Sequence, residues 1–86
     1  MSDSVYYGTV SEIDENGNAV IEQKNKFCVG DTIEIMKPNG DNIAVKVEAM
    51  YTGDGEAVDS CPHPGQEIHL KLSVTPEVYD ILRSTL

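Results

Sequence analysis

The amino-acid sequence predicts an all-β protein, a small closed barrel of six strands. Its 86 residues are enough for one domain with a modest core, and a closed sheet leaves no strand edge unpaired. Two Asn-Gly pairs mark tight hairpin turns. Between the turns, apolar and polar residues alternate with a period of two, which is typical of strands with one face in a core.

Turn chemistry sets the order of the strands. Asn16-Gly17 and Asn39-Gly40 each lie between two alternating segments. Asn-Gly favours a type I′ turn, in which both central residues take positive φ. A third turn is expected at residues 53–56. The six expected strands cover residues 5–13, 18–23, 32–37, 42–50, 57–60 and 66–73.

Alternation within the strands also selects the residues of the core. Every second position is apolar in three segments, which hold Ile33 and Ile35, then Ile43, Val45 and Val47, then Ile68, Leu70 and Leu72. In the first strand, Gly8 and Val10 are expected to point inward, where Gly8 would allow a sharp bend or a close neighbour.

Three parts of the chain are expected. Residues 1–4 form a leader, residues 5–74 the barrel, and residues 75–86 a C-terminal tail packing on the barrel. Thr75 and Pro76 suit the N-cap and first position of one helical turn, but an extended tail fits the sequence equally well. No internal repeat is recognised.

The charge restricts the partners of a free-standing domain. Fifteen acidic and six basic residues give a formal charge of −9. A nucleic-acid binder needs a positive face, so this balance argues against autonomous RNA binding and favours a role in solubility. It leaves open RNA contact by a larger protein. No apolar stretch could span a membrane, and we expect a cytoplasmic domain with Cys28 and Cys61 reduced.

No residue is assigned to catalysis, to a cofactor or to a metal. Cys61 and His63 lie close together, but zinc sites need three or four ligands, so we expect a structural loop in which His63 can touch a partner. His69 is expected on the solvated face of its strand. Cys28 is expected to pack as a small apolar residue, and the acidic pairs at hairpin tips, such as Asp14 with Glu15, are expected to keep ordinary pKa values.

One short segment is the best candidate for a contact with RNA or with a protein partner. Lys24, Asn25, Lys26 and Phe27 combine positive charge with an aromatic ring, and Phe27 could stack on a base. The alternative, which we favour, is that Phe27 packs in the core and both lysines are solvated at the rim.

Short motifs resemble known families. Val-Gly-Asp at residues 29–31 precedes a strand, and Pro-Gly at 64–65 precedes another, as in the barrel-shaped second domain of translation elongation factors. A larger set, in one order, resembles the C-terminal domain of peptidase family U32, the collagenase-like proteases. That set comprises residues 7–10, 25–27, 29–31, 38–40, 50–51, 62–66 and 80–83.

The resemblance to family U32 implies a larger N-terminal catalytic domain in the parent protein. Better-understood relatives hydroxylate bases of transfer or ribosomal RNA, with cysteines of that catalytic domain holding an iron–sulfur cluster. The resemblance therefore implies that this chain is a non-catalytic accessory or substrate-recognition domain. It would dock on the parent's catalytic domain, position a protein or RNA substrate, or support a homodimer.

Three alternatives remain at this point. The domain could have intrinsic peptidase activity, as the family name suggests, although the sequence offers no catalytic triad. It could be an RNA-binding barrel. It could also hold a small apolar ligand inside, which is disfavoured because the side chains of a six-stranded barrel normally fill its interior.

Overall fold

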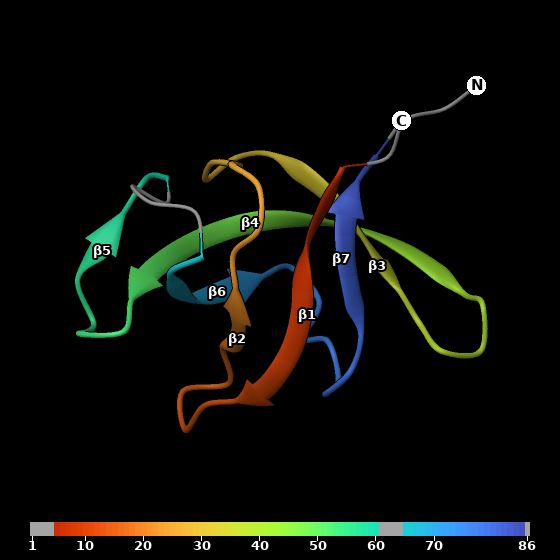
Figure 1. The fold of residues 1–86 in the computed structure, drawn as a ribbon, viewed down its shortest axis with the longest axis horizontal. Helices are drawn as coiled ribbons and strands as arrows, with labels where there is room; N and C mark the ends of the chain where they lie inside the picture. The colour runs from red at the N-terminus through yellow and green to blue at the C-terminus, as the bar shows by residue number, and fades with distance from the viewer. Residues whose placement is uncertain (1–4, 61–64, 86) are drawn as a thin grey trace.

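The structure, a computed structural model, describes residues 5–60 and 65–85. This part of the chain forms seven antiparallel strands and no helix (Figure 1). The strands are β1 (Tyr6–Ile13), β2 (Ala19–Glu22), β3 (Thr32–Met36), β4 (Asn42–Thr52), β5 (Ala57–Val58), β6 (Glu67–Leu72) and β7 (Ile81–Ser84). Their order is β3-β7-β1-β2-β6-β4-β5, and β3 also pairs with β4. This last pairing closes six strands into a ring, so the predicted all-β barrel is confirmed.

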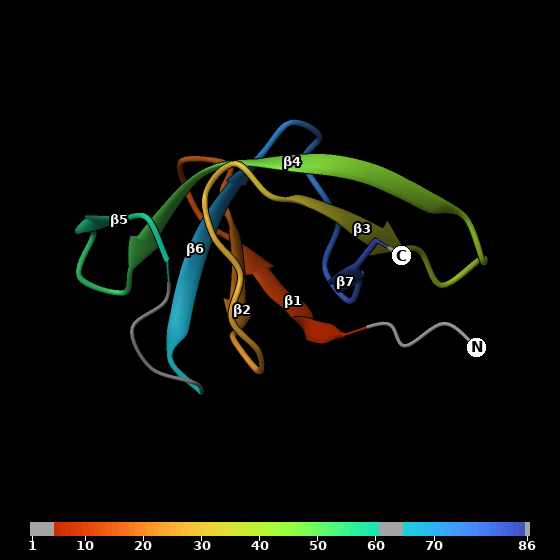
Figure 2. The ribbon, with the colours of Figure 1, turned by 90° about the horizontal axis from the view of Figure 1, so that it is seen from above.

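The sixth strand of the ring is not the expected one. β5 has two residues, pairs with β4 and lies outside the ring, at one end of the molecule (Figure 2). The sixth position belongs to β7, which pairs with β1 on one side and β3 on the other. Residues 81–84 of the expected tail are thus a barrel strand, because strands on both sides satisfy their backbone. The alternative of a helical turn after Thr75 is not formed.

The hairpins differ from the expected turn type. Only the glycine has positive φ in each of the three turns, which hold Gly17, Gly40 and Gly55. The glycine N–H donates to the carbonyl three residues earlier, on Asp14, Lys37 and Thr52 respectively. A type I turn followed by a left-handed glycine produces this pattern, so the prediction of type I′ turns is wrong. In the first hairpin, the Asp14 carboxylate accepts the N–H groups of Asn16 and Asn18, each at 2.9 Å, which stabilises the turn without positive φ at Asn16.

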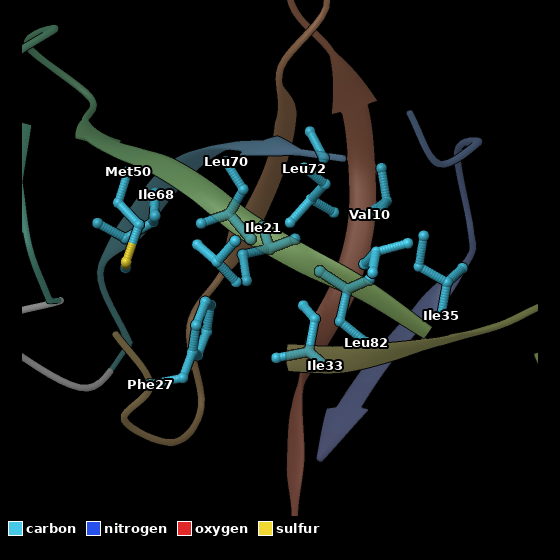
Figure 3. Close-up of a cluster of buried hydrophobic side chains, with 13 residues drawn as sticks. Val10, Ile21, Phe27, Ile33, Ile35, Met50, Ile68, Leu70, Leu72 and Leu82 are labelled. Carbon is cyan, nitrogen blue, oxygen red and sulfur yellow. The ribbon is translucent and has the colours of Figure 1, made fainter. Parts of the chain in front are cut away.

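The inward-facing side chains of all six ring strands fill the barrel (Figure 3). Ile33, Ile35 and Leu82 are fully buried, as expected from the alternation. Phe27 is also in this core, with its ring 4.6 Å from that of Tyr7. Gly8 permits a close approach of strands, because a Cβ there would lie 2.9 Å from the backbone oxygen of Glu22. The barrel therefore has the filled interior expected for six strands.

Candidate functional site

The segment predicted as a partner contact lies in the loop after β2. Lys24, Asn25 and Lys26 are exposed, whereas Phe27 is only 2% exposed. The Phe27 ring is therefore not available to stack on a base, and the favoured alternative of packing in the core is the one observed. His63, with Cys61, lies outside the described residues.

Local contacts reduce what this loop can offer to a phosphate. The Lys24 ammonium lies 2.9 Å from the Glu22 carboxylate. This contact raises the pKa of Lys24, and the negative charge of Glu22 offsets the positive charge of the ammonium. The Asn25 side-chain amide donates to the backbone oxygen of Tyr6 at 2.7 Å. Lys26 is the remaining cation of the loop, so the loop is a weak electrostatic site.

A larger feature is a groove of about 740 Å³ between two hairpin turns. The β1–β2 turn forms one wall, the β4–β5 turn forms the other, and the outer face of β6 forms part of the floor. Its lining includes Asp14, Asn18, Tyr51, Asp54, His69 and Lys71. None of these residues was predicted to form a site, because they come from three segments that only the barrel brings together.

His69 joins the first wall of this groove to its floor. Its Nδ1 lies 2.7 Å from an oxygen of Asp14, and its Nε2 lies 3.4 Å from an oxygen of Glu67. The Glu67 carboxylate lies beside Gly53: a Cβ added to Gly53 would be 3.2 Å from a carboxylate oxygen of Glu67. His69 faces outward as expected, but its side chain is only 22% exposed. It is paired rather than solvated.

The contact between His69 and Asp14 shifts the pKa of both side chains. The hydrogen bond with Asp14, and more weakly that with Glu67, raises the pKa of His69 above its ordinary value. The same bond to His69, helped by the N–H groups of Asn18 and Asn16, lowers the pKa of Asp14. The expectation of an ordinary pKa at this hairpin tip is therefore wrong for Asp14. An imidazole held between two carboxylates ties the β1–β2 hairpin to β6, which is a structural contribution.

Residues 5–60 and 65–85 contain no group of three His, Cys, Asp or Glu side chains that could hold a metal ion. The same residues form no helix long and apolar enough to cross a membrane.

Two further turns repeat one hydrogen-bond pattern. In the 28–31 turn, the N–H of Asp31 donates to the carbonyl of Cys28 at 3.1 Å, and the N–H of Cys28 donates to the Asp31 carboxylate at 2.9 Å. In the 77–80 turn, Asp80 and Glu77 make the same two bonds, at 3.1 and 2.8 Å. Each turn directly precedes a barrel strand, β3 or β7.

The two turns also dock on their neighbouring strands in the same way. Gly30 donates its N–H to Val47 of β4 at 2.9 Å, and Val47 donates back to Asp31 at 2.9 Å. Tyr79 donates to Val10 of β1 at 2.8 Å, and Val10 donates back to Asp80 at 2.9 Å. The barrel thus contains a repeated local structure that the sequence did not predict. In the sequence, the only signal of this repeat is the Val-x-Asp pattern that residues 29–31 and 78–80 share.

The third residue of each turn has positive φ, which is the type II pattern. It is Gly30 in the first turn, with φ 95°, and Tyr79 in the second, with φ 76°. Among the residues that the structure describes, Tyr79 is the one non-glycine residue with positive φ, and it is 75% exposed. The 77–80 turn is therefore the second candidate functional feature.

Comparison with curated proteins gives three relatives that are named for tRNA hydroxylation. The Haemophilus influenzae tRNA hydroxylation protein P is 40% identical over 58 residues, which cover 67% of this chain and 12% of that protein. The Bacillus subtilis tRNA hydroxylation protein P1 is 32% identical over 68 residues, covering 78% and 16%. The Escherichia coli tRNA hydroxylation protein P is 42% identical over 52 residues, covering 60% and 11%. The chain thus matches a small part of each relative.

Two crystal structures have the same fold. Both contain the C-terminal domain of a Geobacillus thermoleovorans protein classed as a U32 peptidase. One has a TM-score of 0.82 at 29% identity and covers 95% of this chain and 93% of that chain. Its selenomethionine variant has a TM-score of 0.79 at 30% identity and covers 92% and 98%. The sequence model of the peptidase family U32 C-terminal domain matches residues 2–83, so the chain belongs to that family, as its motifs indicated.

Proposed function

We propose that this chain is a non-catalytic accessory domain that serves tRNA hydroxylation by a U32-family protein. The observation that carries the proposal is the extent of the alignments. Three proteins named for tRNA hydroxylation match this chain over only 11–16% of their own lengths. Most of each relative lies outside the matched segment, and we assign the chemistry to that larger part.

The role proposed for the domain is to dock on the catalytic part of the protein in the cytoplasm. Its charge of −9 favours a protein partner over direct binding of RNA. Three of its six basic residues are already paired with carboxylates: Lys24 with Glu22, Lys37 with Asp80, and Arg83 with Glu34. A homodimer and direct RNA recognition are the competing forms of the same accessory role.

A replacement experiment tests this function. In Haemophilus influenzae cells lacking their own tRNA hydroxylation protein P, three versions of that protein are expressed: intact, without the aligned segment, and with this chain in place of that segment. We expect the truncated version to lose tRNA hydroxylation, measured by mass spectrometry of digested tRNA, and the chimera to restore it. Full hydroxylation without the segment would contradict the accessory role.

A direct assay addresses the alternative of intrinsic peptidase activity. Crystal structures of the isolated C-terminal domain of a relative indicate that this domain folds by itself, so the purified chain can be assayed alone. We expect no cleavage of gelatin or peptide substrates. Cleavage that co-purifies with the chain through several columns would assign the chemistry to this domain instead.

A further inference from the structure

The 77–80 turn contains strain that the backbone geometry does not require. A type II turn needs positive φ at its third residue, and glycine adopts this conformation without a steric cost. The 28–31 turn follows that rule with Gly30. Tyr79 departs from this rule, because it is a bulky residue in the left-handed region and therefore a conformational outlier. Such strain is often found at functional positions.

The surroundings hold Tyr79 in place. The Asp80 side chain is 1% exposed and accepts hydrogen bonds from the N–H of Glu77 and from the Lys37 ammonium, at 2.8 and 2.6 Å. Two backbone bonds to Val10 fix the other side of the turn. All these contacts involve the backbone or the Asp80 side chain, so they fix the backbone at Tyr79 without involving its ring.

The ring itself points to solvent. Tyr79 is 75% exposed, and two valines of the same connection, Val78 and Val74, are 40% and 46% exposed. These residues lie in the connection between β6 and β7, at the lower end of the barrel in Figure 1. An aromatic ring on a rigid turn loses little conformational entropy when it is bound, which is the property of an interface anchor.

We propose that Tyr79 is the anchor through which this domain docks on the larger part of a U32 protein. The proposal rests on the proposed function, which supplies that partner. The partner surface would offer an apolar pocket for the ring, bordered by basic side chains. The basic border follows from Glu77, which belongs to the same turn as Tyr79 and has a side chain that is 81% exposed.

Charge favours a protein over RNA at this turn. Lys37, the cation that contacts the turn, is 18% exposed and is paired with both Asp80 and Glu77. The turn therefore presents an aromatic ring and a carboxylate with no free positive charge of its own, and phosphates would be repelled.

Hydroxyl-radical footprinting tests whether the ring is covered. The oxidation rate of Tyr79 is measured in the isolated chain and in the full-length chimera described above. Tyr6 is the matched control, because it is 41% exposed and lies in β1. We expect the oxidation rate of Tyr79 to fall about fivefold or more in the chimera, as for a residue enclosed in a dry interface. The rate at Tyr6 should stay constant. Equal Tyr79 rates in both proteins would overturn the proposal.

Two additional measurements separate docking on a protein surface from RNA contact and from a packing role of the ring. Protection of Tyr79 that appears only after adding tRNA would overturn the assignment to a protein surface. Tyr79→Gly removes the ring and relieves the backbone, so the isolated variant should melt no lower than wild type. In the chimera, it should increase the rate of protease cleavage at the domain junction by about tenfold, whereas Tyr6→Ala should leave it unchanged. An unchanged cleavage rate in the Tyr79→Gly chimera would also overturn the proposal.

The hydroxylation assay distinguishes the two possible failures. If the wild-type chimera restores tRNA hydroxylation but Tyr79 stays accessible, the accessory function stands and the anchor assignment fails. If the chimera is stable to protease and Tyr79 is protected, but truncation does not affect hydroxylation, docking stands and the proposed function fails.

Discussion

The 28–31 and 77–80 turns have the same backbone hydrogen bonds, the same Val and Asp, and different third residues. Gly30 takes positive φ with no atom within 4 Å of the position that a Cβ would occupy. Tyr79 takes positive φ with a side chain that is 75% exposed and contributes little to the core. With Gly30 at its third position, the fold builds this turn without strain. The barrel therefore does not require Tyr79, and we propose that a contact outside the domain does.

The two aspartates differ as well. Asp31 is exposed and accepts one N–H, whereas Asp80 is buried and also holds the Lys37 ammonium. The pairing with Asp80 raises the pKa of Lys37, so the lysine stays charged. The strained turn is thus the one with the stronger fixation, which is what a strained conformation needs in order to persist.

The largest expected effect comes from removing this fixation. Asp80→Ala leaves the N–H of Glu77 and the Lys37 ammonium without their buried acceptor. Losing a buried charged partner typically costs about 2–4 kcal/mol, and we expect a decrease of that size in the free energy of unfolding, measured by urea denaturation.

Matched variants of the other turn sharpen this result. Asp31→Ala removes one exposed hydrogen bond and should cost about 1 kcal/mol. Asp80→Asn keeps an acceptor for Glu77 and should fall between the two alanine variants. Equal losses for Asp80→Ala and Asp31→Ala would show that the buried contact with Lys37 does not distinguish the turns.

The same comparison shows what the sequence can predict. The strands, the core and the turn glycines follow from local periodicity and turn chemistry, so most of the barrel was predictable. β7 was not, because Ile81–Ser84 is too short to show alternation and follows a Thr-Pro pair that favours a helix start. Its identity as a strand depends on partners in β1 and β3, far away in the sequence.

The candidate sites were predictable to a smaller degree. Outward alternation placed His69 at the surface, but its contact with Asp14 joins residues 55 positions apart. That contact depends on the pairing of β2 with both β1 and β6, which turn chemistry does not specify. Phe27 was ambiguous for a similar reason, since a loop residue has no alternation to show which way it points.

The second prediction concerns a substitution that introduces strain into the 28–31 turn. Gly30→Ala meets no steric contact in the folded state, so its effect reports the backbone conformation alone. A left-handed non-glycine residue costs about 1–2 kcal/mol, and we expect the free energy of unfolding to fall by about 1 kcal/mol after the gain from a stiffer unfolded chain. Chemical denaturation of Gly30→Ala beside wild type measures this. No loss of stability would mean that strain at the third position is negligible in both turns.

The third prediction uses pH to separate the Asp80 contact from the Asp14–His69 pair. The raised pKa of His69 means that its contribution is complete below about pH 6.5, its ordinary pKa, and is lost as the pH rises through the folded-state pKa. The lowered pKa of Asp14 means that its contribution is present above its ordinary pKa of 3.8 and is lost as the pH falls through the folded-state pKa. The pair therefore stabilises most between these two ordinary values.

Denaturation at pH 6 and pH 8.5 checks the sign. Wild type should lose about 1 kcal/mol more than His69→Gln over this interval, because the charged hydrogen bond weakens only in wild type. The cost of Asp80→Ala should stay the same, since the raised pKa of Lys37 keeps its ammonium charged over this interval. A His69→Gln variant with the same pH dependence as wild type would remove His69 as the source.

The smallest expected effect is the most informative for the comparison. Tyr79→Gly makes the 77–80 turn resemble the 28–31 turn at its third residue. Relief of about 1–2 kcal/mol of strain is opposed by about 1 kcal/mol of additional chain entropy, so we expect a gain in the free energy of unfolding between about 0 and 1 kcal/mol. Calorimetry of the isolated domain measures it, with Tyr79→Ala as the control that loses the ring and keeps the strain. Most single substitutions destabilise a protein, so a neutral or positive result would show that Tyr79 does not serve folding, whereas a clear loss would assign the ring a packing role and weaken the case for an anchor.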